Sequence, residues 1–398
     1  MAATRRLYYD DSLLLAFRAR VIAHGSLAGQ PSVVLDQTGF YPESGGQMAD
    51  RGALGGRPVR DVQVDDQGVV HHLVEGALPA VGGEVACEIE RTRRRLHMAL
   101  HTGQHMLSRA LLDEAHAETV SSRLGETVCT IDLGRDPIDE REIARAESLA
   151  SAVIDDDVPI RAFFPDPAQL AQLPLRREPK VAGEVRVVQI GDFDVSPCGG
   201  THCERSAQVG LVKVTGVERY KGMTRISFQA GRRAREELGR HSELLRVLSR
   251  ELTCGPEAVP QAIEKLRREL SGARESFGRV QGHLIEQAAR ELLADARSLG
   301  APRVVAVFDQ VDVGFLRALA RRITAQPGMV ALLAAQTSEG QHVVIARAQG
   351  SAVDCGALVK QLAAAHGGRG GGRPEIAEGR LPPGVDFAAA VEALGLSS

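Results

Sequence analysis

The first 90 residues carry short apolar runs separated by glycine-containing turns, a pattern that predicts strands. The runs lie at 13–23, 32–36, 59–64 and 69–74. The last two flank Asp65-Asp66-Gln67-Gly68, as the strands of a hairpin do. Several short strands joined in this way are typical of a small barrel or of a sandwich. We therefore expect a β-barrel-like domain over residues 1–90.

From Thr92 the apolar positions recur three and four residues apart, which predicts a helix that continues to about Glu114. The pattern then alternates between strand and helix. It predicts a strand at 126–133, a helix at 138–154, and strands at 159–164, 185–190, 210–214 and 224–229. One long helix against a mainly antiparallel sheet makes residues 91–232 an α+β domain.

Two charge-rich stretches, 231–252 and 258–299, are helical in pattern. In the second, seven apolar residues alternate three and four positions apart: Ile263, Leu266, Leu270, Ala273, Phe277, Val280 and Leu284. This spacing indicates a coiled-coil seam, although an amphipathic helix packed on a neighbouring domain has the same pattern. Residues 233–300 are thus a helical linker, which serves either as a spacer or as the interface of a homodimer.

The last hundred residues return to an α/β pattern and form a C-terminal domain over 301–398. Strands are expected at 303–308, 329–335 and 342–346, and helices at 313–325 and 354–365. A glycine-rich loop at 366–374 precedes the final helix. The fold class expected for the whole chain is therefore α+β with several domains.

The composition excludes several classes of protein. Hydrophobic residues make up 43% and charged residues 25%, which are ordinary globular values. No apolar run approaches the ~18 residues that a membrane span needs, and the N-terminus lacks the apolar core of a signal peptide. A cytoplasmic protein without a membrane partner is expected. The net charge of −3 gives no global case for nucleic acid, so any RNA contact must depend on local patches.

Six cysteines are scattered along the chain, at positions 87, 129, 198, 203, 254 and 355. In a long cytosolic chain this arrangement argues against a disulfide framework. A cysteine with a special role is then a metal ligand or a nucleophile.

Two pairs of residues have the spacing of metal ligands. His101 and His105 lie four apart within the predicted helix, so both imidazoles can reach one ion. Cys198 and His202 flank Gly199-Gly200-Thr201, which permits a tight loop. Three nitrogens and one sulfur suit tetrahedral zinc. Cys203 competes as the sulfur ligand, and Cys198 is favoured because its spacing from His202 mirrors that of the histidine pair.

The identity of Thr102 bears on the chemistry. A zinc protease carries glutamate after the first histidine as its general base, and here that position is Thr102. Proteolysis is therefore excluded. Four protein ligands are ordinarily the mark of a closed structural site, so the ligand count alone does not establish catalysis.

Together these residues resemble a known family. His101-x-x-x-His105 with Cys198-x-x-x-His202 resembles the zinc signature of the editing domain of alanyl-tRNA synthetases and of free-standing alanyl-tRNA editing proteins. Upstream, the segment GFYPESGGQMADRG at 39–52 is similar to the glycine motif that precedes that domain. Downstream, GGGRP at 370–374 resembles the glycine-rich signature of the synthetase's C-terminal domain. The three motifs stand in the family's order and cover nearly the whole chain.

The resemblance also implies what the chain does not do. Only about forty residues precede the glycine motif, where the synthetase has its aminoacylating domain, so activation of alanine is not expected. The C-terminal domain also occurs on phosphoesterases with an Asp-His-His motif, and no such tripeptide is present. The chain therefore looks like the long form of the editing protein, which acts in trans.

The resemblance implies hydrolysis of mischarged tRNA(Ala), chiefly Ser-tRNA(Ala), with Gly-tRNA(Ala) as a second candidate. Because alanine is smaller than serine, the editing site must recognise the serine hydroxyl through a polar group. Ser122, with Ser121 as the second choice, lies about where the family places that group; hydrogen bonds within their own loop are the competing explanation. Gln47 is expected to line the same cleft or to fix a turn, and Glu43 is a weaker candidate of the same kind.

The tRNA itself should meet basic side chains. Arg91, Arg93, Arg94 and Arg95 precede the metal helix and could meet acceptor-stem phosphates, although such runs are also ordinary solvated helix starts. Arg369 and Arg373 in the glycine loop could grip a phosphate together with backbone amides. Lys221 and Arg225, near the edge of the sheet, are further candidate contacts. Two rival functions stay open, namely a tRNA-binding module with a structural zinc and a deacylase for another misacylated tRNA.

Overall fold

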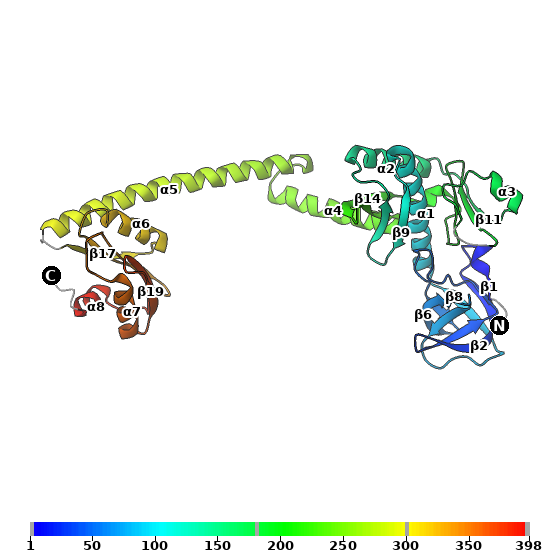
Figure 1. The fold of residues 1–398 in the computed structure, drawn as a ribbon, viewed down its shortest axis with the longest axis horizontal. Coiled ribbons are helices and arrows are strands. Elements are labelled where there is room, and N and C mark those ends of the chain that lie inside the picture. Colours follow the sequence, from blue (N-terminus) through cyan, green and yellow to red (C-terminus); the bar gives the residue numbers. More distant parts are fainter. Residues whose placement is uncertain (1–3, 180–182, 299–301, 395–398) are drawn as a thin grey trace. The chain divides into compact units, whose positions relative to one another are not determined.

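The computed structural model describes residues 4–179, 183–298 and 302–394. The chain divides into two compact units, Met1–Val247 and Leu248–Ser398, which are described separately. Each unit contains both helices and sheets (Figure 1), so the prediction of a mixed α and β multidomain protein is confirmed.

The N-terminal part of the first unit is a closed barrel of six strands in the order β2-β3-β7-β6-β5-β8. The strands are β2 (Ala16–Leu27), β3 (Gln30–Leu35), β5 (Gly52–Leu54), β6 (Arg57–Val64), β7 (Val70–Val74) and β8 (Glu84–Ile89). Alternation of the side chains fills the interior; in β8, Val85, Cys87 and Ile89 are buried while their neighbours are exposed. Of the barrel and the sandwich that the sequence left open, the structure has the barrel.

A short parallel pair, β1 (Arg5–Arg6) with β4 (Gln37–Thr38), and the 3₁₀ turn η1 (Leu7–Tyr9) belong to the same N-terminal segment. The glycine motif at 39–52 follows β4 and runs into β5. It therefore connects two parts of the barrel region rather than standing apart from it.

The rest of the first unit is built on α1 (Arg91–Ala115), a helix buried along most of its length. It packs against α2 (Glu140–Asp155) and against an antiparallel sheet of order β14-β15-β10-β9 (Figure 1). The strands of this sheet are β9 (Thr119–Leu124), β10 (Cys129–Leu133), β14 (Val212–Tyr220) and β15 (Met223–Ala230). This is the expected long helix on an antiparallel sheet, with β9 as a strand that the sequence pattern did not reveal.

A second antiparallel sheet, β11 (Ile160–Phe163), β12 (Val187–Ile190) and β13 (Asp194–Pro197), lies in the same unit. The helix α3 (Pro167–Gln172) and the 3₁₀ turn η2 (Ser206–Val209) complete it. The end of β13 delivers the chain directly to Cys198. The sheet thereby positions Cys198, the first residue of the second predicted ligand pair.

Two helices follow, α4 (Gly231–Glu251) and α5 (Val259–Ser298), with the 3₁₀ turn η3 (Pro256–Ala258) between them. The boundary between the two compact units falls within α4. The end of α5 packs through Ala289 and Ala296 against α6. The seven residues of the predicted seam, by contrast, are exposed. Dimerisation through this row therefore stays a prediction.

The second unit contains a five-stranded sheet of order β16-β17-β18-β20-β19, in which only β16 and β17 are parallel. Its strands are β16 (Arg303–Asp309), β17 (Val330–Thr337), β18 (Gly340–Arg347), β19 (Arg369–Gly372) and β20 (Ile376–Leu381), and its helices are α6 (Val313–Ile323), α7 (Cys355–His366) and α8 (Phe387–Ala393). Val330, Leu332 and Ala334 of β17 face the core with α7 and α8, while Ala331 and Leu333 face the core with α6. A strand buried on both faces explains the unbroken apolar run there.

The glycine-rich stretch is where the structure corrects the sequence interpretation. The expected loop at 366–374 contains the edge strand β19, which pairs with β20, a strand that was also not expected. The glycines are needed for packing, because a Cβ on Gly370 would lie 2.4 Å from a methyl group of Val359 in α7. They do not form a free phosphate-binding loop.

Among the described residues, no helix is long and apolar enough to cross a membrane.

Candidate metal centre

The first half of the site lies on α1. His101 and His105 are on successive turns of the helix, their ring centroids 5.1 Å apart, and both side chains are buried. Helical spacing places them on one face, as the sequence predicted.

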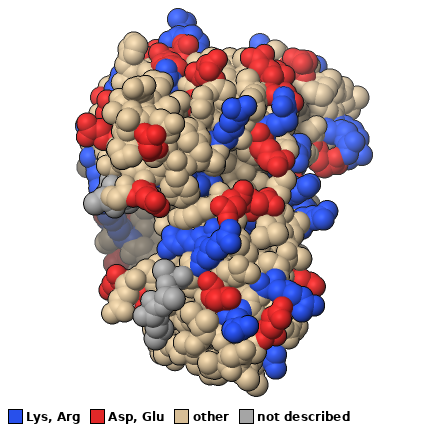
Figure 2. Space-filling model, turned by 90° about the vertical axis from the view of Figure 1, so that its right-hand side faces the viewer, with Lys and Arg blue, Asp and Glu red and all other residues tan. Residues whose placement is uncertain are grey.

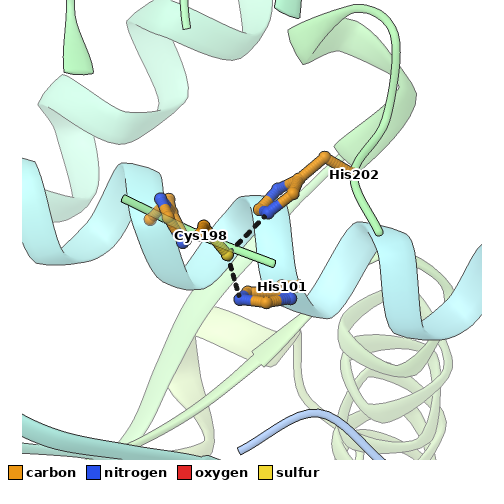
Figure 3. A group of neighbouring side chains, drawn as sticks. His101, Cys198 and His202 are labelled. Carbon is orange, nitrogen blue, oxygen red and sulfur yellow. Dashed lines mark hydrogen bonds between the residues drawn. The ribbon is translucent and has the colours of Figure 1, made fainter. Parts of the chain in front are cut away.

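The second half is the loop that follows β13. The sulfur of Cys198 lies 3.4 Å from His101 Nε2 and 3.3 Å from His202 Nε2, and Figure 3 shows it between these two imidazoles. With His105 the group offers three nitrogens and one sulfur, all within 4.8 Å of one another. The structure therefore brings together the four residues that the sequence singled out, and together they can hold a metal ion.

Cys203, the competing sulfur, is directed elsewhere. Its backbone amide donates to Thr102 Oγ1 at 3.1 Å, and burial raises the pKa of its thiol to about 11. The cluster contains Cys198 and not Cys203.

The close approach of the loop to α1 depends on Gly200. A Cβ at this position would lie 2.1 Å from His101 Cε1 and 3.0 Å from Gln47 Oε1, too close for any side chain. At Gly199 the nearest atom to such a Cβ is the Tyr9 hydroxyl oxygen at 3.4 Å, an ordinary contact. Of the two adjacent glycines, only Gly200 is required by space.

Each histidine of the cluster has a partner at its Nδ1. Gln47 Oε1 lies 2.7 Å from Nδ1 of His101, Thr102 Oγ1 lies 3.2 Å from Nδ1 of His202, and Asp194 Oδ2 lies 3.4 Å from Nδ1 of His105. The last distance is long for a hydrogen bond but is within the range of an ion pair. Such partners fix the tautomer and the orientation of metal-binding imidazoles.

Gln47 and Asp194 are themselves held in place. Gln47 is fully buried, accepts from the Thr201 amide at 3.1 Å and donates to Thr201 Oγ1 at 2.8 Å. Asp194 accepts from Arg176 Nε at 2.7 Å. Although burial raises the pKa of Asp194, His105 and Arg176 lower it to about 2. The carboxylate is therefore ionised at neutral pH.

The charge states of Cys198 and His202 suit metal binding. Despite its burial, the pKa of His105 is raised by the charge of Cys198 and by the contact with Asp194. Burial raises the pKa of the Cys198 thiol, but His101, His202 and His105 outweigh it and hold the pKa well below 9.0. Burial, followed by the charge of His101, lowers the pKa of His202 to about 3. A thiolate beside a neutral imidazole is the protonation state that a metal ion requires.

Two arginines that the sequence offered as tRNA contacts have other roles. Arg94 is completely buried, and its Nε lies 3.0 Å from Asp50 Oδ2. It cannot reach a tRNA, and this prediction is wrong because sequence alone did not show that the face of α1 bearing Arg94 is covered by the glycine motif. Arg93 donates to the Ala49 carbonyl at 2.8 Å and pairs with Glu126, and its side chain is only 10% exposed.

The two candidate serines lie on β9 and face opposite sides of the sheet. Ser122 is opposite Ile131, a core residue, so its side chain is on the face covered by α1. Ser121 is opposite Asp132 and donates to its carboxylate at 2.7 Å, and Arg225 pairs with the same carboxylate. The hydroxyl of Ser122 has no hydrogen bond to another described residue.

The remaining sequence candidates lie outside the cluster. Glu43 is exposed and accepts from Gln63 Nε2 at 3.3 Å. The guanidinium of Arg225 lies over the Tyr220 ring, 3.4 Å from its centroid, as does the Lys221 amine at 5.0 Å. Arg369 and Arg373 are exposed in the second unit.

Sequence reasoning missed Asp194, Arg176 and Arg186 near the cluster. Arg186 Nη1 donates to the Cys198 carbonyl at 3.1 Å and to the Gly200 carbonyl at 2.9 Å, and so braces the metal loop. The only sequence signal for Asp194 was its position four residues before Cys198. The two arginines gave no signal.

Comparison with known proteins places three family models along the chain. The model of tRNA synthetases class II (A) matches residues 5–93, that of the threonyl and alanyl tRNA synthetase second additional domain matches 185–227, and that of the DHHA1 domain matches 300–395. These matches fall on the barrel, on the sheets with the metal loop, and on the second unit.

Individual relatives cover nearly the whole chain. An alanine–tRNA ligase of Methanopyrus kandleri is 32% identical over 96% of this chain, which covers 43% of the ligase. The alanyl-tRNA editing protein AlaX-L of Pyrococcus horikoshii is 29% identical over 94% of each chain. The chain thus spans less than half the length of the ligase. The solved C-Ala domain of Aquifex aeolicus alanyl-tRNA synthetase matches 23% of this chain and 86% of its own length, at 24% identity and a TM-score of 0.22.

Gly200→Ala should weaken metal binding on the order of 10- to 100-fold, because the new methyl group displaces His101 from Gln47. Gly199→Ala is the matched control and should bind metal as the wild type does. Competition titration with a chelating dye measures both affinities. Equal affinities in the two variants would contradict the close approach at Gly200.

Cys198 should be the first cysteine to react with iodoacetamide when the metal-free protein is treated at pH 7. Its depressed pKa makes it a thiolate, and it is half-buried where four of the other cysteines are buried. Added zinc should protect Cys198 and leave the labelling of Cys254, which is also half-buried, unchanged. Peptide mass spectrometry reads out each site; protection of Cys203 instead would reassign the sulfur ligand.

Proposed function

Because the chain is a relative of the long alanyl-tRNA editing proteins, we propose that it is a hydrolase that removes wrong amino acids from tRNA(Ala) in trans. The observation that carries this proposal is the cluster of His101, His105, Cys198 and His202, present in full within a chain that resembles the editing protein along 94% of its length. Ser-tRNA(Ala) is the chief substrate in this proposal and Gly-tRNA(Ala) a second one.

We propose zinc as the metal. With Zn–S near 2.3 Å and Zn–N near 2.0–2.1 Å, the sulfur and nitrogen donors of a tetrahedral zinc lie about 3.5 Å apart. The two distances from Cys198 Sγ to imidazole nitrogens are 3.4 and 3.3 Å, so these side chains need little movement to bind the ion. The donor set and the depressed pKa of the thiol support the same assignment.

When bound, zinc would act as a Lewis acid toward the aminoacyl ester or toward a water molecule. The residues of the chain do the positioning. Gln47 holds His101, Thr102 holds His202, and Asp194 with Arg176 holds His105. Gln47 was a candidate catalytic residue, and its hydrogen bonds support a positioning role instead.

The specificity of the site requires a group that distinguishes serine from alanine. An editing pocket that admits serine also admits the smaller alanine, so size alone cannot protect Ala-tRNA(Ala) from hydrolysis. We propose that the Ser122 hydroxyl hydrogen-bonds the hydroxyl of a bound seryl group. Its place on the α1 side of β9 and its lack of a hydrogen bond to another described residue support this role, whereas Ser121 is engaged with Asp132.

Arg369 and Arg373 remain our proposed contacts for the body of the tRNA. They are exposed and form no ion pair with another described residue, although they lie on and beside an edge strand rather than on a loop.

The direct experiment is deacylation of Ser-, Gly- and Ala-tRNA(Ala) by the zinc-loaded protein. Ser-tRNA(Ala) should be hydrolysed fastest and Ala-tRNA(Ala) spared, and Cys198→Ala should abolish the activity. Hydrolysis of none would leave a tRNA-binding module with a structural zinc, which four protein ligands favour. Equal hydrolysis of Ala-tRNA(Ala) would defeat the specificity argument, and activity only on another misacylated tRNA would identify a different deacylase.

Ser122→Ala should reduce the preference for Ser- over Ala-tRNA(Ala) on the order of tenfold. One lost hydrogen bond costs about 1–2 kcal/mol, which corresponds to a change of that size. Ser121→Ala is the matched control, one residue away and on the other face of the sheet, and should keep the preference. The ratio of kcat/KM for the two substrates measures it. A larger change in Ser121→Ala than in Ser122→Ala would reverse the assignment.

A further inference from the structure

A basic cavity lies at the place where α1 and α4 begin. Its volume is about 340 Å³. Four arginines line it, Arg91 and Arg95 from α1 and Arg232 and Arg235 from α4, together with Gln208. The lining contains no aspartate or glutamate. On the face of the protein drawn in Figure 2, by contrast, Lys and Arg are interspersed with Asp and Glu.

The two helix starts are brought together by small residues. Gly231, the first residue of α4, has φ +62°, and a Cβ there would lie 2.8 Å from the Cβ of Ala99 in α1. Gly231 also donates its amide hydrogen to the Leu211 carbonyl at 2.8 Å. The cavity is therefore a fixed part of the fold of the first unit and does not result from chance orientation of side chains.

Three of the four arginine charges in this cavity are not paired within the described part of the protein. Arg232 pairs with Glu236, whereas Arg91, Arg95 and Arg235 form no ion pair with any other described residue. Arg91 and Arg95 are four apart on one helix, and Arg232 and Arg235 three apart on the other, spacings at which like charges repel. Neither helix has an acidic residue in its first turn, although Glu90 is the N-cap residue of α1, so the positive end of the α4 dipole in particular has no acidic partner there. A bound anion would offset the unpaired arginine charges, the repulsion within each helix and the positive end of the α4 dipole.

The cavity is separate from the metal centre but near it. Arg95 and His101 are six residues apart on α1, which is about 9 Å along the axis, and they lie on different faces of the helix. A nucleic acid strand could therefore have its end at the metal centre while phosphates further along the strand reach the cavity. Guanidinium groups are the side chains best suited to phosphate oxygens.

We propose that this cavity binds backbone phosphates of the acceptor arm of the tRNA, a proposal that rests on the proposed function. It gives Arg91, Arg95 and Arg235 a role in holding the substrate, distinct from the metal centre where the ester is cleaved. These residues contact phosphate and not a base, so they add affinity that depends on salt and not on nucleotide sequence.

The test compares the double variant Arg95→Gln/Arg235→Gln with Arg141→Gln, which removes an exposed, unpaired arginine on α2. For uncharged tRNA(Ala), the double variant should lower the slope of log Kd against log salt by about 1 per residue removed, and raise KM for Ser-tRNA(Ala) without changing kcat. Its Tm should stay the same or rise, because a like-charge pair is relieved on each helix. Arg141→Gln should change none of these values.

Binding and hydrolysis are measured separately, so the two proposals can fail independently. If the wild-type protein hydrolyses Ser-tRNA(Ala) and the double variant has an unchanged salt slope and KM, the cavity proposal is wrong. If the wild-type protein hydrolyses no substrate but the salt slope of the double variant is still lowered, the cavity proposal stands and the editing proposal falls. Inorganic phosphate and AMP are the probes for a small ligand; their tight binding, lost in the double variant while tRNA binding is kept, would overturn the assignment to RNA.

Discussion

A single buried ion pair fixes the position of the glycine motif relative to the metal helix. Arg94 and Asp50 have side chains that are 0% and 1% exposed, and Arg94 also donates to the Ser12 carbonyl at 2.7 Å and to the Gly39 carbonyl at 2.5 Å. Asp50 in turn accepts from the Tyr41 amide. A buried pair satisfied in this way gives little net stability, but loss of one partner leaves an unpaired buried charge at a cost of about 3–5 kcal/mol. The pair therefore acts mainly by specifying one arrangement of two segments.

That arrangement sets the geometry of the metal centre. Gln47 precedes Asp50 by three residues, and His101 follows Arg94 by seven, two turns along the same face of α1. Fixing Asp50 against Arg94 therefore brings the Gln47 amide to the Nδ1 of His101. The barrel region supplies no metal ligand, yet it orients one. This explains physically why the glycine motif belongs with the histidine pair.

The residues that sequence placed correctly are those whose position depends on local periodicity. His101 and His105 share a face because four residues make about one helical turn, and the run of apolar residues at 329–335 predicted the strand β17. Arg94 was misassigned because its partner Asp50 comes from a distant segment that no local pattern connects. The contact of Gln47 with His101 spans 54 residues, so its exact role could not be read from the sequence either. The choice between Ser121 and Ser122 depended on the register of β9 with β10, a strand pairing that the sequence did not reveal. The glycines of β19 suggested a loop because glycine serves both in turns and where two segments pack closely. The sequence alone does not distinguish these two roles.

The metal centre also joins distant parts of the chain. His101 and Cys198 are 97 residues apart in sequence, so an ion held between them would close a loop of that length. In the chain-entropy description, a cross-link closing about 100 residues stabilises the folded state by about 4.7 kcal/mol, because it restricts the unfolded chain. All six cysteines are free thiols, so the ion would provide in a reducing environment the kind of staple that a disulfide provides in an oxidising one. Unlike a disulfide, this staple is in equilibrium with its surroundings, so the lifetime of the folded first unit would follow the supply of metal.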